Sequence, residues 1–145
     1  MIIAVCTVPF LVQGMLMVVD EFYFHRERGL SQWEVLGHPL DTITVACALC
    51  FLLVAKPSVV NLFIFGALST FSCLFVTKDE FVHQEACKPL EHWLHAVLFL
   101  LHPVVFFAAG VLWWQGEGLY PLRVQTGVVA LFGLYQLLYW RKRAA

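Results

Sequence analysis

The side chains of this 145-residue sequence that are best suited to binding a metal ion are concentrated in two short segments. All six histidines and nine of the ten acidic residues fall within residues 20–41 and 79–102, and Glu117 is the one acidic residue outside them. Imidazole and carboxylate groups are common protein ligands of iron, manganese and zinc. The distribution therefore predicts a metal site that both segments build together.

The spacing within the two segments places carboxylates and imidazoles on common helix faces. Side chains three or four residues apart project from the same face of an α-helix. Four pairs have this spacing, and we expect them to supply the metal ligands: Glu21 with His25, Glu34 with His38, Glu80 with His83, and Glu91 with His95. Four helical segments would then each bring one carboxylate and one imidazole.

Further polar residues are candidates for a supporting role. Three aspartates either coordinate the metal or accept hydrogen bonds that orient the imidazoles, and the second role is favoured: Asp20, Asp41 and Asp79. His102 lies seven residues beyond His95, about 10 Å deeper on the same helix face. Its side chain is either a ligand or proton relay, or a buried imidazole bonded to a carbonyl that Pro103 leaves free.

Some of the polar residues have interpretations other than metal binding. A solvated polar cap is favoured for Glu27, Glu85 and His92, but such a cap explains neither the pairing nor the repetition of the four pairs. Cys87 lies near the predicted ligands, but the first segment has no equivalent cysteine, so the predicted ligand set contains no sulfur. The odd number of cysteines does not indicate a disulfide framework.

The composition predicts that lipid surrounds the elements that carry these residues. A hydrophobic fraction of 61% with 13% charged residues exceeds what one small soluble core could bury. We expect an all-α integral membrane bundle, a single domain of residues 1–145 with five transmembrane helices. The apolar runs cover residues 2–19, 33–55, 59–77, 90–114 and 124–140, the last within an expected helix at 122–142.

Basic residues predict how these helices are oriented in the membrane. Lys56 and Arg123 lie on one side, whereas the other seven basic residues lie on the side of the two polar segments. Because basic residues favour the cytoplasmic side, we expect the N-terminus outside and both the metal site and the C-terminus on the cytoplasmic side.

The two polar segments resemble each other, which predicts an internal repeat. The triplet DEF at residues 20–22 recurs at residues 79–81, and the spacing of Glu34 and His38 recurs in Glu91 and His95. Residues 2–55 and 59–114 would then be two copies of one helical hairpin, and the first four helices would form a four-helix bundle.

The ligand set resembles that of the ferritin-like di-iron and di-manganese carboxylate proteins. In that family, glutamates and Glu-x-x-His pairs from a four-helix bundle hold two metal ions. Here only Glu80 and His83 have the Glu-x-x-His spacing, and the setting is a membrane. The resemblance covers the two polar segments and implies two divalent ions, with iron favoured over manganese or zinc.

The length of the second apolar run places predicted ligands below the membrane surface. Residues 42–55 give about 21 Å of helix against about 30 Å of hydrocarbon, so the span must include residues 34–41. An ionised side chain there costs about 2.5–3.5 kcal/mol. The basic residues that we expect to lie too near water to neutralise all the carboxylates are Arg26, Arg28, Lys78 and Lys88. Two divalent ions would balance four carboxylates.

Three functions from different classes fit these features. The favoured one is an oxidoreductase with a dinuclear Fe, Mn or Zn centre near the cytoplasmic face, acting on a lipid-soluble substrate that enters from the bilayer. The alternatives are a zinc-dependent membrane hydrolase, and a protein that binds, senses or transports metal without catalysis. The net charge of -1 gives no support for nucleic-acid binding.

Overall fold

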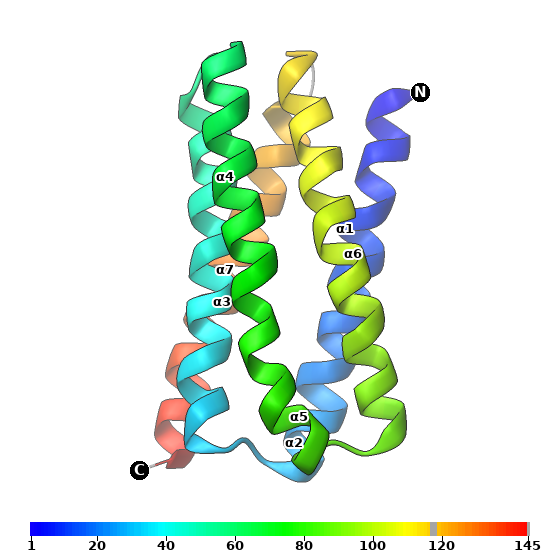
Figure 1. The fold of residues 1–145 in the computed structure, drawn as a ribbon, viewed down its shortest axis with the longest axis vertical. Coiled ribbons are helices and arrows are strands. Elements are labelled where there is room, and N and C mark those ends of the chain that lie inside the picture. The colour runs from blue at the N-terminus through cyan, green and yellow to red at the C-terminus, as the bar shows by residue number, and fades with distance from the viewer. Residues whose placement is uncertain (117–118, 145) are drawn as a thin grey trace.

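The computed structural model describes residues 1–116 and 119–144, and the regular elements in these ranges are all helices. Five long helices run side by side along the molecule (Figure 1). They are α1 (Ile2–Val19), α3 (Gln32–Val54), α4 (Val59–Phe75), α6 (Pro89–Trp114) and α7 (Leu119–Ala144). The predicted all-α class is confirmed.

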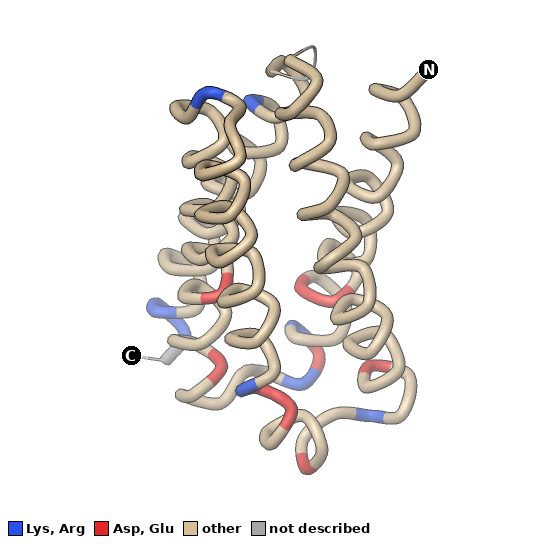
Figure 2. The backbone as a smooth tube through the Cα atoms, turned by 45° about the horizontal axis from the view of Figure 1, so that its top comes forward, with Lys and Arg blue, Asp and Glu red and all other residues tan. Residues whose placement is uncertain are grey.

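Short helical elements lie at the end of the bundle that is lowest in Figure 1. The π-helical segment η1 (Asp20–His25) and α2 (Arg26–Arg28) continue α1, and the 3₁₀ segment η2 (Val76–Asp79) and α5 (Glu80–Ala86) continue α4. Figure 2 shows that the acidic positions among the described residues, and most of the basic ones, lie towards this end, where α7 also ends. The two polar segments therefore occupy one end of the molecule.

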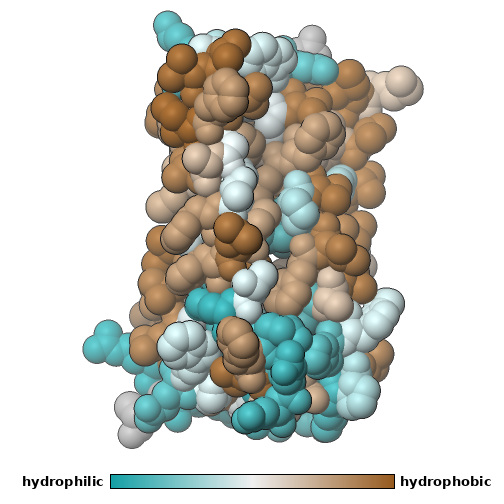
Figure 3. Space-filling view, in the orientation of Figure 1, coloured by the Kyte–Doolittle hydropathy of each residue, from teal (hydrophilic) through white to brown (hydrophobic). Residues whose placement is uncertain are grey.

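Four helical stretches are long and apolar enough to cross a membrane: Ile2–Arg28, Gln32–Val54, Val59–Ala86 and Pro89–Trp114. Large apolar side chains such as Leu11, Phe63 and Leu100 are exposed on them. Figure 3 shows hydrophobic surface over most of the length of the molecule, with hydrophilic surface gathered at the lower end. This surface matches the hydrocarbon interior of a lipid bilayer, as the composition predicts.

The fifth predicted span, α7, is less apolar than the other four long helices. It is not among the four stretches that are long and apolar enough to cross a membrane. One of its polar residues, Gln136, is buried and accepts a hydrogen bond of 2.7 Å from the Thr42 hydroxyl of α3. The absence of a side chain at Gly133 permits this approach, because a Cβ there would lie 2.9 Å from Thr42 Cγ2. Polar and close contacts thus attach α7 to α3.

The packing of the long helices does not confirm the two predicted hairpins. α1 packs mainly on α6, and α3 packs on α4 and α7, while α4 also contacts α6. α1 and α3, which were expected to form the first hairpin, are joined through η1 and α2 rather than by extensive packing. The main apolar core, which includes Leu49, Phe65 and Ala109, lies in the half of the bundle farther from the polar end.

Candidate metal centre

Four histidines from four different elements gather at the polar end of the bundle. They are His25 of η1, His38 of α3, His83 of α5 and His95 of α6. His25 stacks on His38 with ring centroids 4.8 Å apart, and His83 stacks on His95 at 4.0 Å. The two pairs are farther from each other, at 5.9 Å between His25 and His95 and 6.4 Å between His38 and His83. Each stacked pair comes from one of the two polar segments.

Buried carboxylates surround these imidazoles. Among the described residues, four groups of three or four side chains have ligand atoms that all lie within 4.8 Å of one another. These groups are His83/Cys87/His95, Asp20/His25/Glu91/His95, Glu21/His25/His38 and Glu34/His38/His83. They include every predicted ligand except Glu80. The cluster is therefore compatible with a metal site, and sequence spacing identified most of its members.

The π-helical turn η1 explains how two successive carboxylates face the same imidazole. In a π-helix the hydrogen bonds join residues five apart, so residues four and five apart share one face. Glu21 Oε2 lies 3.4 Å from His25 Nδ1, and Asp20 Oδ2 lies 3.3 Å from His25 Nε2. Asp20 Oδ1 is also 2.9 Å from His95 Nε2. Asp20 thus contacts two imidazoles, which fits the predicted orienting role.

Glu34 and Glu91 are placed by the first turns of α3 and α6. Ser31 caps α3: its hydroxyl accepts the Glu34 backbone N–H at 3.3 Å, and the Glu34 carboxylate accepts the Ser31 backbone N–H at 2.9 Å. α6 begins at Pro89, which is well suited to a first helical position. Acidic side chains are favourable at both positions because helix N-termini carry partial positive charge.

Arg28 lies inside the cluster, so the prediction that it stays near water is wrong. Its guanidinium donates two hydrogen bonds to Glu34, at 2.6 and 3.0 Å, and one to Glu91 at 3.0 Å. Its side chain is only 15% exposed. The aliphatic part of arginine is long enough to bring the charge back from α2 into the bundle.

Lys78 also departs from that prediction. Its ammonium donates to both oxygens of Asp41, at 2.7 and 2.8 Å, and to Asp79 at 2.9 Å. Asp79 further accepts the indole N–H of Trp33 at 3.0 Å and lies 4.0 Å from His38 Nε2. Asp41 and Asp79 are therefore paired with Lys78 beside the imidazoles, and neither belongs to a candidate ligand group.

A negative charge excess remains after these ion pairs are counted. Arg28 and Lys78 contribute two positive charges against six carboxyl groups, which leaves four negative charges when all six are ionised and the imidazoles are neutral. The six are Asp20, Glu21, Glu34, Asp41, Asp79 and Glu91. The ion pairs thus compensate the cluster only in part, and two divalent ions would balance the remainder.

Glu80 does not face the other predicted ligands. Its carboxylate lies 2.9 Å from Nε2 of His92, and both side chains are about one-third exposed. Glu80 and His83 both lie in the α-helix α5, which follows η2, but only His83 is buried in the cluster. The neighbouring Asp79 is buried, whereas Glu80 lies beside His92 and not beside His83 as expected.

His102 lies deeper in the bundle, outside the candidate ligand groups of the described residues. Gln13 Nε2 donates to its Nδ1 at 3.2 Å, and its Nε2 donates to the Ser72 hydroxyl at 3.1 Å. Ser72 in turn lies 2.7 Å from the Thr44 hydroxyl. His102 is therefore satisfied by side chains of α1 and α4, and not by the carbonyl considered from the sequence.

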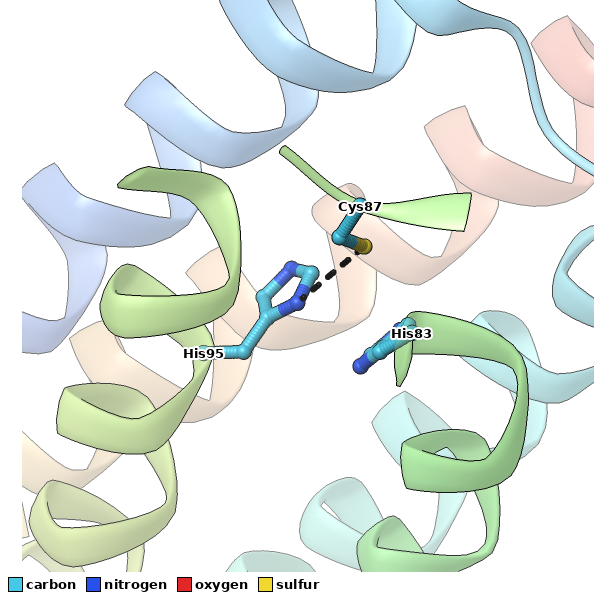
Figure 4. Close-up of side chains that lie close together, drawn as sticks. All are labelled: His83, Cys87 and His95. Atoms are coloured by element: carbon cyan, nitrogen blue, oxygen red, sulfur yellow. Dashed lines mark hydrogen bonds between the residues drawn. The ribbon is translucent and has the colours of Figure 1, made fainter. Parts of the chain in front are cut away.

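Two residues outside the predicted set also contact the cluster. Trp140 of α7 is buried and donates its indole N–H to Glu21. Cys87 Sγ lies 3.8 Å from His95 Nδ1, with His83 beside it (Figure 4). Burial, aided by the Glu91 carboxylate, raises the pKa of the Cys87 thiol to about 12. The four-residue spacing of His83 and Cys87 was the available signal, but Cys87 has no counterpart in the first segment.

Several imidazole nitrogens of the cluster are buried without a hydrogen-bond partner. They are Nε2 of His25 and both ring nitrogens of His83. His83 Nε2 lies 3.9 Å from Glu34, beyond hydrogen-bond distance, and His25 Nε2 faces Asp20 at 3.3 Å without hydrogen-bond geometry. An unsatisfied buried polar group costs about 1–3 kcal/mol. A metal ion is the kind of partner that satisfies such nitrogens.

A cavity of about 210 Å³ adjoins the cluster. One part of its lining consists of cluster residues, including His25, His38 and His95. The remainder is mostly apolar and comes from α1, α6 and α7, with Val105, Phe132 and other large side chains. The cavity therefore brings polar ligands and an apolar binding surface together.

The interpretation of the cluster as a metal centre depends on three observations. Most of its donors are buried, three of its imidazole nitrogens lack partners, and its carboxylates outnumber the local cations. Comparison of the chain with models of protein families, with curated protein sequences and with solved structures finds no match.

Proposed function

We propose that this chain is a membrane-embedded metalloprotein that holds two divalent ions in the imidazole and carboxylate cluster and catalyses oxidation or reduction of a lipid-soluble substrate. The observation that supports the metal centre most strongly is the His83 side chain. It is 4% exposed, stacks on His95, and has no hydrogen-bond partner at either nitrogen. A buried imidazole with two free nitrogens between carboxylates is well placed for metal coordination.

Two ions are favoured by the pairing of the imidazoles and by the charge. Each stacked histidine pair lies beside a carboxylate that has no Lys or Arg partner: Glu21 beside His25 and His38, and Asp20 beside His95. Two divalent ions would also balance the four excess negative charges of the cluster. The origin of each pair in a separate polar segment further supports the proposed internal repeat.

Iron is favoured because nitrogen and oxygen donors dominate the cluster, and manganese is suited to the same donors. When bound, iron would supply the electron-transfer chemistry that amino-acid side chains lack. The protein's own part is to hold the donors in place through Arg28, Ser31 and Trp140, and to exclude water by burying them.

The cavity supports a lipid-soluble substrate. Its apolar lining between α1, α6 and α7 continues from His38 and His95 to Phe132, so an apolar molecule would be held with one end at the cluster. Gln13 and His102 also line the cavity and offer hydrogen bonds to a polar group of the substrate.

The proposed topology has five spans with the cluster on the cytoplasmic side. Inward-facing Gln136 lowers the apolarity of α7 without exposing a polar group to lipid, which is compatible with a spanning helix. Labelling of cysteines introduced at Arg26 and at Ser58 would test the orientation. We expect a membrane-impermeant reagent to reach only residue 58 from outside intact cells, and labelling at residue 26 would contradict the orientation.

Elemental analysis with optical and spin-resonance spectra of the purified protein tests the function. We expect two iron or manganese ions per chain, and a spectrum that changes on reduction. His38→Ala combined with His95→Ala should lose the metal, whereas His92→Ala is the matched control and should retain it, because His92 lies outside the cluster. Stoichiometric zinc without a redox-sensitive spectrum would replace the oxidoreductase with the hydrolase.

A further inference from the structure

The two halves of the cluster differ in their third donor. The pair His25 and His38 is grouped with the Glu21 carboxylate, whereas the pair His83 and His95 is grouped with the Cys87 thiol. Figure 4 shows the thiol and the two imidazoles facing one another where the chain passes from α5 to α6. A repeat with equivalent halves would have a carboxylate at this place.

The hydrogen bonds of His95 direct one of its nitrogens towards Cys87. Nε2 of His95 lies 2.9 Å from the Asp20 carboxylate, which fixes the N–H at Nε2 and leaves the lone pair at Nδ1. Nδ1 is the atom that lies 3.8 Å from Cys87 Sγ. A carboxylate that accepts the second N–H of an imidazole is the common arrangement behind a histidine ligand, because it fixes the ring and strengthens the donor.

The third member of this group has nitrogens to spare. His83 stacks on His95 at 4.0 Å, and neither of its buried nitrogens has a partner among the described residues. The stack and the close approach of the thiol bring three donors of one group within 4.8 Å of one another. An isolated cysteine would not indicate a site, but here the unpartnered imidazole provides a second and independent indication.

We infer that Cys87, His83 and His95 form a sulfur-containing metal position, so that the two positions of the proposed centre are chemically different. This inference rests on the proposed metal centre and assigns the ligands of one of its ions. As the bond between Sγ and the metal forms, the S–H bond breaks and the proton leaves to solvent. A thiolate with two imidazoles suits a borderline-soft divalent cation such as zinc, cobalt or ferrous iron. The position of Glu21, His25 and His38 suits a harder cation.

Cobalt(II) is the probe that separates these statements, because a thiolate bound to cobalt gives a charge-transfer band in the near ultraviolet. Metal would first be removed with a chelator and Co(II) then titrated into the full-length protein in detergent. Three proteins would be compared: the wild type, Cys87→Ser, and a matched control in which the other four cysteines are replaced by alanine. These four are Cys6, Cys47, Cys50 and Cys73, which lie in the long helices away from the cluster.

The inference predicts the band in the wild type and in the control, and its loss in Cys87→Ser together with an affinity for one Co(II) about 10-fold weaker or more. In the control protein, Co(II) should also protect Cys87 from alkylation, a measurement that does not require the Cys87→Ser variant to fold. Stoichiometric Co(II) binding without the band or the protection would overturn the assignment of Cys87 and leave the metal centre standing. Failure of the wild type to bind Co(II) at all would overturn both proposals.

Discussion

Replacing Arg28 by methionine tests whether one cation holds the glutamates of the cluster together. The guanidinium makes three hydrogen bonds of 2.6 to 3.0 Å to Glu34 and Glu91, whose side chains are at most 1% exposed. Methionine keeps much of the aliphatic packing but removes the charge and all three donors. Two carboxylates would then face each other in a buried site without a Lys or Arg partner.

The size of the effect follows from burial. Removing one partner of a buried ion pair costs about 3–5 kcal/mol, because the remaining charge stays desolvated. Arg28 retains some exposure, so we expect the lower end of that range, a loss of about 3 kcal/mol in the free energy of unfolding of the metal-free protein. Replacing Glu34 and Glu91 by glutamine in the same chain should recover most of this loss, since no buried charge is then left unpaired.

Unfolding by sodium dodecyl sulfate in mixed micelles, followed by circular dichroism in the presence of a chelator, would measure these differences. Arg26→Met is the matched control, because Arg26 is two residues away but exposed and stacks on Phe22 and Tyr139. Its replacement should leave the unfolding curve nearly unchanged. Equal unfolding curves for Arg28→Met, Arg26→Met and the wild type would refute the assigned role of Arg28.

Three further outcomes are expected. Gly133→Ala should lower the free energy of unfolding by about 1–3 kcal/mol, because the new Cβ would lie 2.9 Å from Thr42 Cγ2, whereas Gly127→Ala has open space and should have little effect in the same assay. Ser72→Ala should cost about 1–3 kcal/mol, since His102 and Thr44 would each lose a buried partner, and an unchanged unfolding curve would contradict the hydrogen-bond chain. Metal content after desalting should fall in acid, at a pH somewhat below the ordinary histidine pKa of about 6.5, because the bound ions compete with protons for the imidazoles, and full retention of metal in strong acid would contradict histidine ligation.

The helical class and most of the candidate ligands could be predicted because they depend on composition and on the α-helical period. His38 and Glu34 lie in the regular helix α3, and their predicted positions in the cluster hold. The predicted pairing of Glu80 with His83 failed although both residues lie in the α-helix α5. Glu80 instead lies beside the partly exposed His92, and the π-helical turn η1 brings Asp20 in beside Glu21.

Contacts between distant segments could not be predicted from local spacing. Arg28 and Trp140 reach the cluster only because α2 and α7 pack against it, and no periodic pattern in the sequence specifies that packing. Cys87 follows His83 by four residues, but the expectation of two equivalent repeats excluded it. The symmetry of the sequence thus predicted which histidines the structure brings together, but it concealed a difference between the two halves.

The dependence of thermal stability on added metal tests the central claim most directly. Chelated protein in detergent would be melted alone and with Fe(II), Mn(II) or Zn(II), and a ligand that binds only the folded state at 100 times its dissociation constant stabilises it by about 2.7 kcal/mol. We predict a higher midpoint with metal for the wild type and for His92→Ala, and no increase for His38→Ala combined with His95→Ala. Identical melting of the chelated wild type with and without all three metals would contradict a metal centre in this cluster.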